Sequence, residues 1–196
     1  MPKRKRVEHI DTRVIKSLEE LNRETSFCDV YKTIENPHFR SFCVIKPDKF
    51  LITNLRNIFK RCGIAQLTSI GCGDGLIELL LSQFFTVTGI DFNTRREMAP
   101  CVRKHIRYYE VRRQEIIPIP SDHALFLSWP LLYTWREYFE TYKGRCVVIY
   151  GDSTCEPYPP IDFAPYEYFR HWKQMHVPIQ KNHGRSTLAI FVYVRI

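Results

Sequence analysis

The sequence predicts an α/β domain with a mostly parallel sheet, and three observations lead to this prediction. Strand candidates alternate with helix candidates through most of the chain, which is the pattern of β–α–β units. A glycine-rich turn follows the first strand candidate directly and leads into a helix. Residues 176–196 have the pattern of an antiparallel hairpin. The 196 residues are enough for one such domain with its own core.

Composition places the chain among ordinary globular proteins, because 44% of its residues are hydrophobic and 26% are charged. No apolar run approaches the ~20 residues that a membrane helix requires, and no apolar stretch follows the basic N-terminus. We therefore expect a soluble intracellular protein without membrane contact. The seven cysteines include no C-x-x-C pair, which favours free thiols over a disulfide framework or a metal site. No bound metal is expected.

The N-terminal part is predicted to be separate from the main domain. Residues 1–6 form a basic arm with four consecutive cations at Lys3–Arg6, and residues 11–22 have the apolar spacing of a short helix. We therefore divide the chain into this arm and helix at 1–24 and one domain at 25–196. The arm has the composition of a nuclear localisation signal for an import receptor, and a solvated disordered run is an equally good interpretation.

A helix is expected to open the alternating pattern. Pro47 and Asp48 are good residues for a helix start, and Gly63 ends the helix. Its apolar stripe consists of Phe50, Leu51, Leu55, Ile58 and Phe59. A strand at 66–70 and a helix at 76–84 then flank the glycine-rich turn.

The remaining elements continue the alternation. The other strand candidates are 86–90, 108–112, 124–127, 146–150 and 188–194. The other helix candidates are 100–107, 131–142 and 165–174. In the C-terminal hairpin, residues 176–180 and 187–196 are the expected strands and 181–186 the expected loop.

The glycine-rich turn carries the functional interpretation. Gly71, Gly73 and Gly75 permit backbone angles that other residues avoid, and they let a ligand approach the main chain. The helix that begins near Leu76 directs unpaired N–H groups and a positive dipole end toward the same place. Asp91 follows the second strand, where its carboxylate can accept hydrogen bonds from both hydroxyls of a ribose. A tight connection without a ligand is the simpler alternative for such a turn.

The spacing of the glycines distinguishes between the known classes of nucleotide-binding motif. The dinucleotide fingerprint G-x-G-x-x-G requires a third glycine where this chain has Leu76, and the lysine of a phosphate-binding P-loop is absent. The segment Ser69–Gly75 instead resembles motif I of the class I S-adenosylmethionine-dependent methyltransferases. The segment Val87–Asp91 resembles the acidic end of the second strand in that family. The resemblance covers about residues 45–196.

The resemblance implies a Rossmann-like three-layer sandwich with a mostly parallel seven-stranded sheet that ends in an antiparallel hairpin. It implies S-adenosylmethionine as the cofactor, and Gln114 and Glu115 lie where the third strand of the family delivers a polar residue to the adenine. The candidate cofactor-binding residues are Gly71, Cys72, Gly73, Asp74, Gly75, Asp91, Gln114 and Glu115.

In this family the end of the fourth strand faces the transferred methyl group. Here it reads Leu-Ser-Trp-Pro and resembles a poorly characterised group of methyltransferases, which also has a later Tyr-x-Gly, here Tyr142 and Gly144. Ser128 stands where amine- and glutamine-methylating members carry Asn or Asp. Trp129 is predicted either to stack on a planar acceptor or to pack under the sheet. Asp152, expected just beyond the fifth strand, is predicted to act as a base or to be a solvated carboxylate.

The formal net charge of +8 favours acidic partners, with nucleic acid first. Arg103 and Arg107 are expected to share one face of the predicted helix at 100–107, and Tyr108 follows them. Cations with interleaved aromatic residues suit phosphate contacts and base stacking, and a solvated helix face is the more frequent alternative.

The sequence thus predicts an S-adenosylmethionine-dependent methyltransferase that acts as a monomer or weak dimer on an unidentified acceptor, with nucleic acid or protein favoured by charge. The first alternative is a catalytically inactive binding module for RNA or a protein partner. The second is a nicotinamide-dependent oxidoreductase, against which Leu76 and the terminal hairpin argue.

Overall fold

The computed structural model describes residues 47–73, 75–92, 105–112, 115–128, 135–152, 171–175, 179–183 and 186–196. The predicted basic arm, the predicted helix at 11–22 and the proposed boundary between residues 24 and 25 lie outside these residues and stay predictions. Within the described ranges, no helix is long and apolar enough to cross a membrane.

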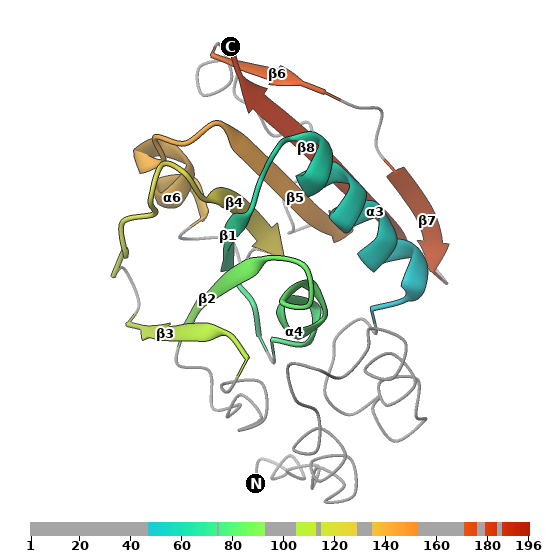
Figure 1. Cartoon of the computed structure of the whole chain (residues 1–196), viewed down its shortest axis with the longest axis horizontal. Coiled ribbons are helices and arrows are strands. Elements are labelled where there is room, and N and C mark those ends of the chain that lie inside the picture. Colours follow the sequence, from blue (N-terminus) through green and yellow to red (C-terminus); the bar gives the residue numbers. More distant parts are fainter. Residues whose placement is uncertain are drawn as a thin grey trace, which may run out of the picture.

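The strands form one mixed sheet in the order β3-β2-β1-β4-β5-β8-β6, with β7 also paired to β8 (Figure 1). Strands β1 to β5 pair in parallel, whereas β8 is antiparallel to β5, β6 and β7. The strand bounds are β1 Gln66–Ile70, β2 Thr86–Phe92, β3 Arg107–Val111, β4 Ala124–Ser128, β5 Cys146–Asp152, β6 Trp172–Gln174, β7 Ile179–His183 and β8 Ser186–Arg195.

The outermost position of the sheet is shared by two short strands. Trp172 of β6 pairs with Arg195 near the end of β8, and Ile179 of β7 pairs with Ile190 nearer its start. The eight strands therefore fill seven positions. This arrangement confirms the predicted mostly parallel sheet with an antiparallel hairpin at its end.

Helices cover both faces of this sheet. Along β4, Phe126 packs in one apolar cluster with α3 and α4, whereas Leu125 and Leu127 pack in a second cluster with α6. Alternate residues of a strand point to opposite faces, so the two clusters are two separate layers of core. The described part of the chain is thus the predicted helix–sheet–helix sandwich. Its helices are α3 Lys49–Arg61, α4 Leu76–Leu81 and α6 Trp135–Thr141.

Helix α3 begins and ends at residues that favour these boundaries. The Oδ1 atom of Asp48 accepts a hydrogen bond from the N–H of Leu51 at 2.8 Å and so caps the first turn. At the other end the N–H of Cys62 donates to the carbonyl of Ile58 at 3.0 Å, and Gly63 follows with a φ of 63°. The start at Asp48 and the stop at Gly63 are therefore confirmed.

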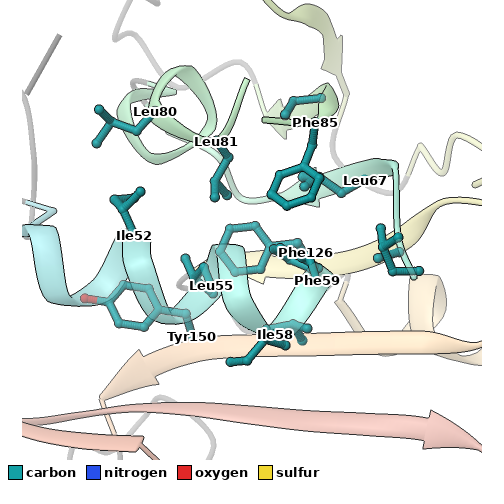
Figure 2. Close-up of a cluster of buried hydrophobic side chains, with 14 of the residues drawn as sticks. Ile52, Leu55, Ile58, Phe59, Leu67, Leu80, Leu81, Phe85, Phe126 and Tyr150 are labelled. Carbon is teal, nitrogen blue, oxygen red and sulfur yellow. The ribbon is translucent and has the colours of Figure 1, made fainter. Parts of the chain in front are cut away.

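The predicted apolar stripe of α3 is wrong at one residue. Phe50 is 48% exposed, because it points to the side of the helix opposite the buried face, and Ile52 is buried in its place. The ring of Phe59 contacts Phe85 and Phe126 edge-on, with centroid separations of 5.6 Å and 5.9 Å (Figure 2). This packing fixes α3 against the sheet and against α4, which follows the glycine-rich turn.

Two predicted helices are wrong where the structure describes them. Arg107 begins strand β3 instead of ending a helix at 100–107. The strand expected at 108–112 is confirmed as β3, one residue earlier; among the described strands it pairs with β2 alone, and Val111 is its one buried residue. Trp172 belongs to β6 rather than to a helix at 165–174, and a strand of three residues is too short to show any period.

Two further boundaries differ from the prediction. The helix expected at 76–84 ends at Leu81, and the hydroxyl of Ser82 donates to the carbonyl of Leu79 at 2.7 Å within the final turn. The hairpin loop expected at 181–186 is shorter, because β7 extends through His183 and β8 begins at Ser186.

Candidate functional site

The glycine-rich turn lies at the carboxyl end of β1, in the middle of the parallel part of the sheet. Gly71, Gly73 and Gly75 have φ values of 77°, 54° and 74°, which residues with a side chain rarely adopt. The N–H of Gly75 donates to the carbonyl of Cys72 at 2.8 Å, so the turn is tight. Gly75 is also the N-cap of α4 and offers no side chain to its first N–H groups. The N–H groups of the three glycines all donate within the protein, whereas the first N–H groups of α4 have no side-chain cap.

Asp91 lies beside this turn. It belongs to β2, one residue beyond Ile90, which pairs with the last residue of β1. The side chain is 8% exposed, and its Oδ2 atom accepts a hydrogen bond from the N–H of Gly73. A Cβ atom on Gly73 would lie 4.0 Å from that oxygen. The structure thus brings together the glycines and the carboxylate that the sequence singled out.

The side chain of Cys72 packs in the hydrophobic core. It is buried, and a Cβ atom on Gly89 of β2 would lie only 2.9 Å from its Sγ atom and 3.3 Å from Cδ1 of Ile106. Gly89 is therefore required for the close approach of β2 to the turn. Cys72 can serve the site only through its main chain.

A buried polar pair behind the turn was not predicted from the sequence. The hydroxyl of Ser69 in β1 donates to Oε1 of Glu78 in α4 at 2.5 Å, and Glu78 is 1% exposed. This hydrogen bond joins the strand and the helix on the two sides of Gly71–Gly75. The available signal was a single carboxylate inside the otherwise apolar sequence of α4. A carboxylate in the first turn of a helix is also favoured by the helix dipole.

Ser128 is the last residue of β4 and lies at the same edge of the sheet. Its neighbour Leu127 pairs with Ile70, so Ser128 lies level with the start of the turn at Gly71. The side chain is buried. Trp129 lies outside the described residues, so its two predicted roles stay open.

Asp152 was expected beyond the fifth strand, and this placement is wrong. It is the last residue of β5, and its main chain pairs with Leu188 of β8. The pairing with β8 extends the strand by two residues past Tyr150, which is itself level with Ser128. The main chain of Asp152 still lies at the carboxyl edge of the parallel strands.

The residues predicted near the adenine are only partly described. Glu115 follows β3 and is exposed. Its Oε2 atom accepts from the N–H of Arg112 at 2.9 Å, and its own N–H donates to the carbonyl of Arg112 at 2.9 Å. The carboxylate thus closes a turn at the carboxyl end of β3. Asp74 and Gln114 lie outside the described residues.

The predicted basic face does not form as expected. Arg107 and Tyr108 are the first residues of β3, where they pair with Thr88 and Gly89 at the amino end of the strand. Arg107 therefore cannot share a helical face with Arg103, which lies outside the described residues. Asp91 pairs further along β3, so Arg107 is at the end of this strand away from the glycine-rich turn.

The Tyr-x-Gly sequence has a structural role at the opposite end of the sheet. The hydroxyl of Tyr142 donates to the carbonyls of His123 and Cys146, at 2.5 Å and 3.0 Å, where β4 and β5 begin. Burial raises the pKa of Tyr142 to about 12. A Cβ atom on Gly144 would lie 2.2 Å from that hydroxyl, so only glycine fits under the ring. Thr68 Oγ1 bonds with Nδ1 of His123 at 2.9 Å, which adds a second side-chain contact at this end of the sheet.

Comparison with known proteins identifies the fold through structure alone. No protein-family model matches the chain, and no curated protein matches its sequence. Magnesium protoporphyrin IX methyltransferase from Synechocystis PCC 6803, solved with bound S-adenosylmethionine, is similar with a TM-score of 0.58 and 10% identity over 90% of this chain and 98% of that one. Precorrin-6y C5,15-methyltransferase from Geobacter metallireducens GS-15 is similar with a TM-score of 0.51 and 10% identity, over 80% of this chain and 92% of that one.

The 23S rRNA methyltransferase ErmE is a third similar structure. Its TM-score is 0.52 at 15% identity, over 76% of this chain and 69% of that one. Identities this low show the fold and leave the reaction open. The chain therefore has a Rossmann-like fold similar to that of these methyltransferase structures.

Proposed function

We propose that this protein is an S-adenosylmethionine-dependent methyltransferase. The observation that carries the proposal is the contact between Asp91 and Gly73, inside a turn of three glycines with positive φ at the centre of a methyltransferase fold. This position is the one at which folds of this class bind nucleotides, outside the carboxyl ends of the strands. One similar structure, which contains S-adenosylmethionine, supports the choice of cofactor.

The described residues fit such a cofactor. A carboxylate accepts up to about four hydrogen bonds, so the bond from Gly73 is compatible with bonds from ribose hydroxyls to the same carboxylate. The turn has no side chain at Gly71, Gly73 or Gly75, and a ligand can therefore lie directly on the main chain. We assign the adenine end to Gln114 and Glu115, beyond β3, by analogy with the family.

The chemistry requires little covalent help from the protein. S-adenosylmethionine supplies a methyl group on a sulfonium, which is an excellent leaving group. The protein then has to hold the acceptor in line and exclude water, and positioning of this kind can contribute several kcal/mol, up to about 10. Ser128, level with Gly71, is the described residue best placed to orient an acceptor. We propose Trp129 and Asp152 as its neighbours in this role, the first to cover a planar acceptor and the second to act as base.

The acceptor is not selected by the fold. Two of the similar proteins are named for magnesium protoporphyrin IX and for 23S rRNA, which are unrelated molecules. The net charge of +8 favours an acidic acceptor such as RNA, or a protein bound to it. We propose Arg103, Arg107 and Tyr108 as contacts with such an acceptor outside the cofactor site.

A methyl-transfer assay tests the proposal. Purified protein and S-adenosylmethionine labelled in the methyl group are incubated with total RNA and, separately, with total protein. We expect the wild-type chain to transfer labelled methyl groups to precipitable RNA or protein. We expect no such transfer by Asp91→Ala. Glu110→Ala is the matched control, because Glu110 is exposed, pairs with Asp91 across β2 and β3, and should leave transfer unchanged.

The outcomes separate the proposal from its alternatives. Transfer that is equal in wild type and Asp91→Ala would contradict the assigned cofactor site. Binding of S-adenosylhomocysteine without transfer to either pool would favour an inactive binding module. Binding of NAD without binding of S-adenosylhomocysteine would replace the proposal by an oxidoreductase.

A further inference from the structure

Exposed cations gather at the amino end of the parallel strands, opposite the glycine-rich turn. They come from the end of α3, the connection between α6 and β5, strand β6 and the end of β8. We call this surface the basic pole, and its residues are Lys60, Arg61, Lys143, Arg145, Lys173 and Arg195. In Figure 1 the C-terminus, β6 and the end of α3 lie in the upper part of the view, and α4 lies below them.

Hydrogen bonds join the parts of the chain that carry the basic pole. The Nη2 atom of Arg145 donates to the carbonyls of Cys62 and Gly63, at 3.1 Å and 3.2 Å, and so links the start of β5 to the end of α3. The N–H of Arg195 donates to the carbonyl of Arg145 at 2.9 Å. Lys173 lies in β6, which pairs with the end of β8. The cations therefore share one continuous surface although they are far apart in the sequence.

No carboxylate neutralises the basic pole within the described part of the chain. All of its side chains are exposed, and none forms an ion pair with a described residue. Glu140 of α6 is an exposed carboxylate three residues before Lys143, and the two form no ion pair. Cations that are gathered without counter-charges create a positive potential that attracts anions.

Two arginines of the basic pole are held in fixed orientations. Besides the bonds of Arg145, an Nη2 bond of 2.6 Å joins Arg195 to the carbonyl of Tyr142, and the Arg195 guanidinium lies 4.8 Å from the centre of the Trp172 ring. A guanidinium has five N–H donors, so these contacts leave donors for phosphate oxygens. Its planar fork matches the geometry of a phosphate, and an oriented fork loses less side-chain entropy on binding.

The composition of the basic pole favours a nucleic acid over a protein or a membrane. Protein interfaces have an apolar and aromatic core, and membrane-surface segments need an apolar face. Among the described residues, the exposed large hydrophobic residues in this region are Ile196 and, beyond β6, Met175, while Trp172 is only 9% exposed. Interfaces with nucleic acid are more polar and much more positively charged than those with protein.

We propose that the basic pole binds the phosphodiester backbone of a nucleic acid strand, with Arg145 and Arg195 as oriented contacts and Lys60, Lys143 and Lys173 around them. The surface is separate from the proposed cofactor site. Strand β5 has seven residues between the pole and the carboxyl edge of the sheet, which at about 3.3 Å per residue is roughly 20 Å. The proposal therefore adds a binding surface and does not depend on methyl transfer.

Binding of a labelled oligonucleotide at several salt concentrations tests the proposal. Fluorescence anisotropy follows an oligouridylate of about 20 nucleotides, between about 50 and 200 mM NaCl, and an oligothymidylate of equal length distinguishes RNA from DNA. We expect the wild-type chain to bind, with an affinity that falls steeply as salt rises. Each lost phosphate contact on a single strand should make the slope of log affinity against log salt shallower by about 0.7.

Lys60→Gln and Lys49→Gln are a matched pair of variants. Both lysines are exposed, both lie in α3, and they stand at opposite ends of it, so the two changes remove the same charge from different ends of the sheet. We expect the salt slope to become shallower by about 0.7 in Lys60→Gln and to stay unchanged in Lys49→Gln. The triple variant Lys60→Gln, Lys143→Gln and Lys173→Gln should lose up to about 2 units of slope. Circular dichroism checks that each variant is folded.

The wild-type chain gives a further readout that needs no variant. Exposed lysines are acetylated with and without the oligouridylate, and the modified sites are identified by mass spectrometry. We expect the oligouridylate to protect Lys60, Lys143 and Lys173, whereas Lys49 should be acetylated equally in both samples.

Several results would overturn the proposal. These are no binding of either oligonucleotide by the wild type, an unchanged salt slope in the triple variant, and an equal loss in Lys49→Gln and Lys60→Gln. Polyglutamate bound as tightly as the oligouridylate would point to an acidic protein instead, and binding to phosphatidylserine vesicles without binding to either oligonucleotide would point to a membrane. The test involves neither S-adenosylmethionine nor methyl transfer, so its outcome is independent of the proposed methyltransferase function.

Discussion

Gly89 in β2 determines how closely this strand approaches the glycine-rich turn, and Gly89→Ala tests that role. The added Cβ atom would lie 2.9 Å from the Sγ atom of Cys72 and 3.3 Å from Cδ1 of Ile106. Both neighbours are buried, so neither can move into solvent. Excess volume of this kind in a packed core costs about 1–3 kcal/mol. We expect the free energy of unfolding to fall by an amount in this range.

Gly151→Ala is the matched control. Gly151 also lies in a strand of the parallel sheet, near its carboxyl end, and a Cβ atom there meets nothing within 4 Å. We therefore expect Gly151→Ala to leave stability unchanged, or to raise it by up to about 1 kcal/mol through the unfolded state.

Urea unfolding followed by circular dichroism measures both effects, and a double-mutant cycle identifies their cause. If the contact with Sγ is responsible, Cys72→Ala removes the obstacle, and the double variant should be at least about 0.5–1 kcal/mol more stable than the sum of the single changes predicts. Additive single effects, or an equal loss in Gly151→Ala, would refute the close approach of β2 to the turn.

Three further predictions concern the fold. Tyr142→Phe removes the hydroxyl that reaches the carbonyls of His123 and Cys146, and it should lower the free energy of unfolding in urea by about 1–3 kcal/mol. An unchanged urea midpoint of unfolding in Tyr142→Phe would show that these hydrogen bonds do not stabilise the fold. Because burial raises the pKa of Tyr142 from 10.0 to about 12, the folded state holds this proton more tightly than the unfolded state. The free energy of unfolding should therefore fall as pH rises from about 10 to 12. Urea unfolding repeated across this pH range should show a smaller fall in Tyr142→Phe than in the wild type. Asp48→Ala removes the cap of α3 and should cost about 0.5–2 kcal/mol, whereas Asp48→Asn should cost less, since an amide oxygen also caps; equal losses would argue against the hydrogen bond to Leu51.

The fold was predictable where the sequence has a strong local signal. Asp48 and Gly63 mark the ends of α3, and the buried strands β4 and β5 contain short apolar runs between turn residues. The prediction failed at β6, which was expected to lie in a helix. This strand has only three residues, so pairing with β8 decides its structure and periodicity does not. Strand β3 was predicted at 108–112 and lies at Arg107–Val111.

The candidate site was predictable to a similar degree. The glycines and Asp91 are separated in sequence, yet the order of two parallel strands is enough to place them together. The pair of Ser69 and Glu78 could not be found from a pattern, because its members lie on different elements and meet only when α4 packs on β1.

Calorimetric titration with S-adenosylmethionine and S-adenosylhomocysteine tests the central claim most directly, with wild type, Asp91→Ala and Glu110→Ala measured side by side. The loss of charge-assisted hydrogen bonds at Asp91 should cost about 2–4 kcal/mol, or roughly thirty-fold or more in affinity. We predict micromolar binding by the wild type and by Glu110→Ala, and its loss in Asp91→Ala. No binding by the wild type, or equal binding by Asp91→Ala, would contradict the assignment of Gly71–Gly75 and Asp91 as the cofactor site.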